Sequence, residues 1–155
     1  MSGTKKILGI GSALGDDCAG WLLVRALRDD VADAHLAAWQ IYELDRPGLA
    51  LLGWFEDADE VVIVDAMAGG APPGALRELQ LGDLTPLSRM SSSHGFGVAE
   101  TLQLAGALDV LPPMLRVFGL EVNCADQGAA PSPALLAAVP YAARCLVQAL
   151  REVTQ

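Results

Sequence analysis

The chain has 155 residues, of which 52% are hydrophobic, and its net charge at pH 7 is −9. This length can bury one full hydrophobic core and is too short for two ordinary domains, so we expect a single domain over residues 1–155. Lys5 and Lys6 are the only lysines. So little positive charge argues against nucleic acid and acidic membranes as partners.

The termini and the cysteines narrow the class of protein further. No apolar run approaches the roughly 20 residues of a membrane span, and the N-terminal MSGTKK leads into a strand rather than a signal-peptide core. We therefore expect a cytosolic protein. Cys18, Cys124 and Cys145 form neither an even set nor a CxxC pair, so we expect reduced thiols and no thiolate zinc site.

Strands and helices alternate along the predicted chain. Apolar or alternating segments predict strands over 5–10, 37–44, 60–66, 75–81 and 114–122. Helical spacing of apolar residues predicts helices over 18–28, 48–54, 97–108 and 132–152. This order predicts an α/β fold: a three-layer α/β/α sandwich with a twisted, mostly parallel mixed five-stranded sheet. The segment 75–81 alternates in polarity and is expected to be its antiparallel strand.

Polar side chains follow three of these segments where a functional crevice is expected. The stretch GIGSALGDDCAG, residues 9–20, resembles a phosphate-binding glycine loop but carries Asp16 and Asp17. Asp65 ends the strand VVIVD, and His94 ends a serine-rich loop before the third helix. The topology gathers these groups at the carboxyl edge of the sheet. Two carboxylates and an imidazole suit nickel, zinc or manganese, with coordination positions left open.

Each of these residues also has an ordinary structural interpretation. One aspartate of the pair at 16 and 17 can cap the following helix, and we expect Asp16 to have mainly this role or that of shaping the turn. Asp65 can be a turn residue, and His94 can be a loop histidine bonded to serine hydroxyls. We expect His35 to be a solvated turn residue. Two glutamates have similar structural interpretations: we expect Glu100 to be a charge on a helix surface and Glu121 to cap a strand end.

Four blocks of the sequence resemble one family in their order and spacing. GIGSALGDDCAG is similar to the first signature of the hydrogenase maturation proteases, VVIVDAMAGGAPPG to the second and SSSHGFGVAETLQLA to the third. VFGLEV resembles their late strand, which ends in a glutamate. The resemblance covers about 150 residues, and the ordered set is far more specific than any single block.

The resemblance implies an endopeptidase that removes a C-terminal extension from the large-subunit precursor of a nickel-iron hydrogenase after nickel insertion. The family's nickel-engaging residues carry over by position to Asp17, Asp65 and His94. Nickel would arrive within the substrate, so no permanently bound cofactor is implied.

The chain departs from the family pattern in several places. Ser12 stands where asparagine is usual, and the first loop is about one residue shorter. LDRPG at 44–48 replaces a D-G-G-T-x-G motif, and Val122 replaces a proline.

Two alternative functions remain open. One is a non-catalytic module that binds the nickel-loaded precursor. The other is a cysteine hydrolase that uses Cys18 as nucleophile and His94 as base. The neighbouring aspartates weaken the second alternative because they raise the pKa of a thiol.

Overall fold

A computed structural model of the chain describes residues 3–29, 34–83, 97–123 and 130–152. Its five strands form one sheet in the order β2-β1-β3-β5-β4. The first four strands in that order are parallel to one another, and β4 is antiparallel to β5. The strands are β1 (Thr4–Gly11), β2 (Trp39–Asp45), β3 (Ala58–Met67), β4 (Leu76–Leu79) and β5 (Met114–Glu121).

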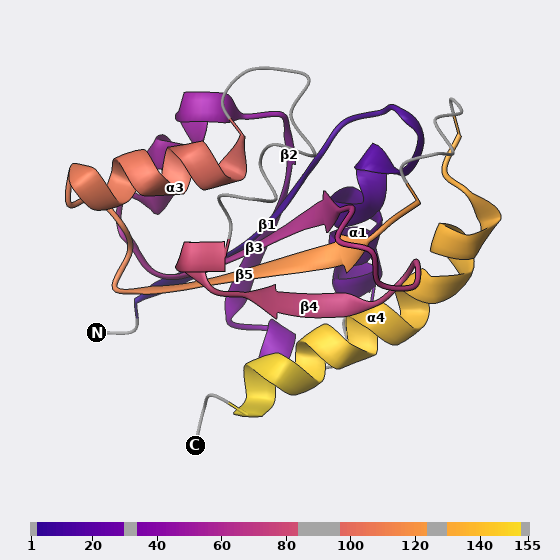
Figure 1. The fold of residues 1–155 in the computed structure, drawn as a ribbon. Helices are drawn as coiled ribbons and strands as arrows, with labels where there is room; N and C mark the ends of the chain where they lie inside the picture. Colours follow the sequence, from indigo (N-terminus) through magenta and orange to yellow (C-terminus); the bar gives the residue numbers. More distant parts are fainter. Residues whose placement is uncertain (1–2, 30–33, 84–96, 124–129, 153–155) are drawn as a thin grey trace.

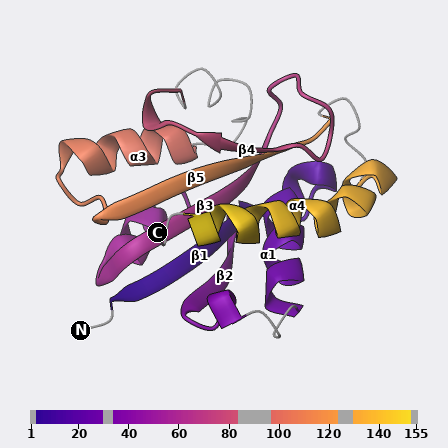
Figure 2. The same cartoon turned by 90° about the horizontal axis from the view of Figure 1, so that it is seen from below.

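Helices cover both faces of the sheet, which confirms the predicted mixed α/β fold (Figure 1). Two long helices, α1 (Ala19–Asp29) and α4 (Pro133–Glu152), bury their apolar sides on one face. The 3₁₀ helix η3 (Gly48–Phe55) and helix α3 (Val98–Ala107) cover the other. Figure 2 shows α3 and α4 on opposite sides of β5.

The predicted strands and long helices all lie within two residues of their observed bounds. Two local features differ. Residues 48–54 were expected as a short helix and form the 3₁₀ helix η3. The helix expected from Cys18 begins at Ala19, after a 3₁₀ turn η1 (Gly15–Cys18). Two further 3₁₀ turns, η2 (Ala34–Leu36) and η4 (Leu81–Asp83), were not predicted.

Helix α4 is long and apolar enough to cross a bilayer, with a mean hydropathy of 1.4 over its most apolar window. This is weak evidence for a membrane span, because the helix packs Leu135, Val139 and Leu146 into the core and core helices pass the same test. No other helix of the described residues passes it. The expected cytosolic location stays a prediction.

The glycines of the first loop allow α1 to lie directly on the sheet. A Cβ atom on Gly20 would be 2.4 Å from the carbonyl oxygen of Ile10 and 2.6 Å from that of Val64. Similarly, a Cβ on Gly11 would be 2.5 Å from the carbonyl oxygen of Asp17. The absence of a side chain at Gly11 and Gly20 therefore allows η1 and α1 to pack closely on β1 and β3.

We predict that Gly20→Ala lowers the free energy of unfolding by about 1–3 kcal/mol, because the added methyl group meets backbone atoms that cannot move aside cheaply. Gly106→Ala in α3 is the matched control, since its Cβ would meet only Leu111, at 3.6 Å. This control should be neutral or stabilising by up to about 1 kcal/mol, because alanine favours a helix. Urea unfolding followed by circular dichroism measures both; equal effects of the two substitutions would contradict the prediction.

Candidate active site

The candidate site lies at the carboxyl edge of the parallel strands, on the side of α3. The chain goes from β1 to β2 in one direction along the sheet and then back to β3, so the loops after β1 and β3 meet there. Thr101 brings the start of α3 to the same edge: its hydroxyl lies 3.0 Å from the carbonyl oxygen of Gly97 and 3.4 Å from that of Gly48.

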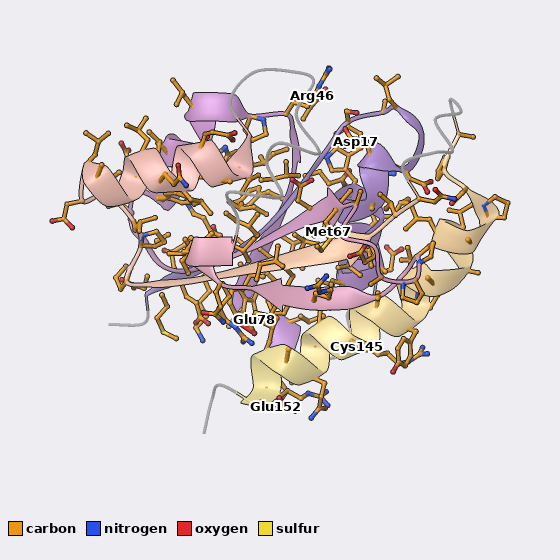
Figure 3. The ribbon with its side chains drawn as sticks, viewed as in Figure 1. Asp17, Arg46, Met67, Glu78, Cys145 and Glu152 are labelled. Carbon is orange, nitrogen blue, oxygen red and sulfur yellow. The ribbon has the colours of Figure 1, made fainter. Side chains whose placement is uncertain are left out.

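Asp17 lies in η1, directly above the end of β1 (Figure 3). Asp17 is exposed, and its Oδ2 accepts a 2.5 Å hydrogen bond from the hydroxyl of the buried residue Ser12. The Leu14 N–H in turn donates to the Ser12 oxygen at 3.3 Å. Ser12, which departs from the family's usual asparagine, therefore orients the Asp17 carboxylate.

Asp65 lies at the end of β3 and is half-buried. Its Oδ1 accepts a hydrogen bond of 2.8 Å from the N–H of Ala66. Burial, and then the negative charge of Asp17, raise the pKa of Asp65 to about 7 from an ordinary value of 3.8. The structure thus brings two predicted acids close enough to interact, and their repulsion is a property that a bound cation would relieve.

The third predicted residue, His94, lies outside the described residues. The chain resumes at Gly97, which begins α3 at the same edge of the sheet. Within the described residues, no group of three or more histidines, cysteines or acids could hold a metal ion. The part of the proposed set that can be seen is therefore the pair Asp17 and Asp65.

Asp16 does not cap the helix that follows it, so that expectation was wrong. Its buried carboxylate instead accepts hydrogen bonds from Ser132, one residue before α4. Sequence alone could not show this, because the two residues are 116 positions apart.

Glu121 has a larger role than the strand-end cap that was expected. Its side chain is 1% exposed and accepts a hydrogen bond of 3.0 Å from Gly69 N–H, and Arg77 pairs with it at 3.4 Å. A Cβ on Gly69 would lie 2.6 Å from Glu121 Oε1. Glu121 therefore holds the loop after Asp65 in place. The clue in the sequence was an acid that directly follows the apolar run 117–120 of β5.

Glu100 was expected as a helix surface charge, and this was only partly right. It lies in the first turn of α3 but is half-buried. Among the described residues, its Oε2 is buried and has no hydrogen-bond partner.

The segment LDRPG, residues 44–48, begins in the last two residues of β2 and lies beside the first loop. Arg46 adopts a left-handed backbone conformation with φ of 40°, which glycine takes far more readily. Its N–H donates to the carbonyl oxygen of Gly11 at 3.0 Å, and its exposed side chain pairs with Asp45. The segment LDRPG thus places a cation, Arg46, at the rim of the site (Figure 3).

Cys18 is poorly suited to act as a nucleophile. Its thiol is 8% exposed and lies 3.2 Å from the carbonyl oxygen of Gly15. Burial, followed by the charges of Asp16 and Asp17, raises the pKa of this thiol. Cys18 and Cys145 are free cysteines, and Cys124 lies outside the described residues.

The comparisons with known proteins identify the family. A family model described as hydrogenase maturation protease matches residues 23–149. The chain belongs to the hydrogenase maturation protease family. It is thus an endopeptidase of that type, as the sequence blocks predicted. The family match begins after the loop that carries Asp17, so it is independent of that first block.

One relative and two solved structures are similar to this chain. The chain is 27% identical over 153 residues to the hydrogenase expression/formation protein HupD of Rhodobacter capsulatus, covering 95% of this chain and 70% of that protein. The fold is that of the hydrogenase maturating endopeptidase HybD from E. coli, with a TM-score of 0.75, 24% identity and coverage of 97% and 93% of the two chains. The Thermococcus kodakarensis protease HycI matches with a TM-score of 0.70, 21% identity and coverage of 96% and 92%.

The raised pKa of Asp65 predicts how stability varies with pH. Between the unfolded pKa of 3.8 and the folded pKa of about 7, the folded state binds the proton of Asp65 more firmly than the unfolded state does. The stability that this proton gives the folded state is therefore fully present at low pH and is lost as pH rises through 7. Asp65→Asn should therefore be more stable than wild type by about 1–3 kcal/mol at pH 8 and nearly equal to it at pH 4. Urea denaturation at both pH values measures this.

Asp45→Asn is the control for this prediction, because Asp45 is an exposed acid at the same edge. Its effect on stability should be small and the same at both pH values. An Asp65→Asn effect that did not grow between pH 4 and pH 8 would show that Asp65 is not destabilised by its surroundings.

Proposed function

We propose that this protease removes the C-terminal extension of the large-subunit precursor of a nickel-iron hydrogenase, and that it recognises nickel already inserted in that precursor. The observation that carries the proposal is the placement of two carboxylates, Asp17 and Asp65, on the adjoining elements η1 and β3 at the functional edge of the sheet, where the charge of Asp17 acts on Asp65, in a member of this family. Such a pair gains free energy when a divalent cation arrives.

The surroundings of the pair support a role toward a metal ion. Carboxylate and imidazole are ligands that suit nickel, and three protein ligands leave positions for groups of the substrate. Asp17 is exposed, so an ion carried by another protein can reach it. The hydrogen bonds that Ser12 and Ala66 donate fix one oxygen of each acid and thereby set its orientation.

In the proposed reaction, Asp17, Asp65 and His94 complete the coordination of nickel held by the precursor and so dock the scissile peptide. The ion or a carboxylate then polarises the peptide carbonyl or activates a water molecule. Asp65, with a pKa of about 7, can exchange a proton at neutral pH. A precursor without nickel lacks the group that orients it, so cleavage serves as a checkpoint on nickel insertion.

The decisive experiment incubates the purified protein with nickel-loaded and nickel-free precursor and measures the precursor mass before and after. We predict cleavage of the loaded form alone. Asp17→Asn, Asp65→Asn and His94→Ala should each fold and lose at least about 100-fold in cleavage rate, because each removes one ligand of a set that acts as a unit. Asp45→Asn, at the same edge, should cleave at the wild-type rate.

Each other outcome of this experiment has a definite meaning. Binding of the loaded precursor with no change in mass would support the non-catalytic module. Cleavage of the nickel-free precursor would contradict recognition through nickel. Wild-type activity of His94→Ala would remove His94 from the set.

We predict that Cys18→Ala keeps cleavage within about threefold of wild type, because the thiol is buried and its pKa is raised. The rate of mass loss of the loaded precursor, with circular dichroism as a check on folding, measures this. A folded Cys18→Ala protein that had lost cleavage would instead favour the cysteine hydrolase.

A further inference from the structure

Asp16 and Asp17 are neighbours in sequence, but their side chains go to different places. Asp17 reaches the exposed edge, whereas Asp16 is 5% exposed and turns toward α4. The N–H of Ser132 donates to Asp16 Oδ1 at 2.6 Å, and the Ser132 hydroxyl donates to Oδ2 at 2.8 Å. Both oxygens of Asp16 are therefore engaged, and Asp16 is not available as a further metal ligand.

Ser132 is the residue from which α4 starts. Its hydroxyl oxygen accepts the N–H of Leu135 at 3.2 Å, and its carbonyl oxygen accepts that of Leu136 at 3.1 Å. This is the bonding of a helix N-cap. The partial positive charge at the start of a 20-residue helix further stabilises the carboxylate placed there. Because α4 buries one side in the core from its first turn to its last, it offers a rigid support.

The first loop has few other side-chain links to the rest of the molecule. The Ser12 N–H donates to the Asp17 carbonyl oxygen, the Asp17 N–H donates to that of Leu14, and Ser12 Oγ bonds the Asp17 side chain. These bonds give the loop its shape but all lie within residues 12–17. The bonds to Ser132 join that shape to a helix on the far face of the sheet.

We infer that Asp16 and Ser132 are positioning residues of this protease: together they anchor the 12–18 loop to the start of α4 and so hold Asp17 in place opposite Asp65. This inference rests on the proposed role of Asp17. It assigns α4, which supplies no residue to the candidate site, a part in the reaction.

The test combines amide hydrogen exchange by NMR with cleavage of the nickel-loaded precursor. In Asp16→Ala, the amides of Ser12 and Asp17 should exchange at least 10-fold faster, and kcat should fall 10- to 100-fold, because misplaced metal ligands cost about that much. Asp16→Asn should restore both to within about threefold, since its amide can still accept from Ser132 N–H and donate to Ser132 Oγ.

Val139→Ala controls for a general loss of stability, because it truncates a buried side chain of α4 away from the loop. All variants are compared at a temperature at which each is fully folded. Val139→Ala should leave the loop amides and kcat unchanged. Where Asp16→Ala does not fold, Ser132→Ala takes its place; it keeps the backbone bond to Oδ1 and should show a smaller change in the same direction.

The outcomes separate this inference from the proposed function. Unchanged exchange at Ser12 and Asp17 in Asp16→Ala overturns the anchor whatever the enzyme does. Faster exchange with unchanged kcat overturns its importance for the reaction. A wild-type protein that cuts no precursor overturns the proposed function instead, and the exchange rates still decide whether the anchor exists.

Discussion

The repulsion between Asp17 and Asp65 is the interaction that the surrounding structure has to overcome. Burial, together with the charge of Asp17, raises the pKa of Asp65 to about 7, so holding both acids ionised at neutral pH costs free energy. The close packing of α1 on β1 and β3 provides the necessary constraint. Because Gly20 lets the helix backbone touch the ends of both strands, η1 has to lie beside the end of β3. This packing therefore constrains where η1, the turn that carries Asp17, can lie.

The strands and long helices could be predicted closely from sequence because their signals are local. Segments such as 60–66 are continuously apolar, as expected for a strand buried on both faces, and 75–81 alternates as expected for the antiparallel edge strand. The 3₁₀ turn over Gly15–Cys18 could not be predicted in this way. It depends on a left-handed glycine, Gly15 with φ of 53°, and on the contact of α1 with the sheet.

The candidate site was predictable only where topology determines position. The rule that functional groups gather at the carboxyl ends of parallel strands correctly brought Asp17 and Asp65 together. The same rule says nothing about side-chain direction, which is why Asp16 was assigned to the wrong helix. Its partner, Ser132, belongs to a distant segment of the chain. Glu121 was underestimated for a similar reason, since its partners Gly69 and Arg77 come from the loop and strand after β3.

The hydrogen bonds that each acid accepts divide Asp16, Asp17, Asp65 and Glu121 into two kinds. Asp16 and Glu121 have both oxygens engaged by hydrogen bonds or an ion pair, so they shape the loops that carry the other two. The Asp17 carboxylate accepts one hydrogen bond, from the Ser12 hydroxyl, and the Asp65 carboxylate accepts one, from the backbone N–H of Ala66; within the described residues their remaining oxygens accept none. Within the described residues, a cation that reaches this edge therefore finds free carboxylate oxygens on Asp17 and Asp65 but not on Asp16 or Glu121. Two acids that look equivalent in the sequence DD thus take opposite roles because one faces a helix N-terminus and the other faces solvent.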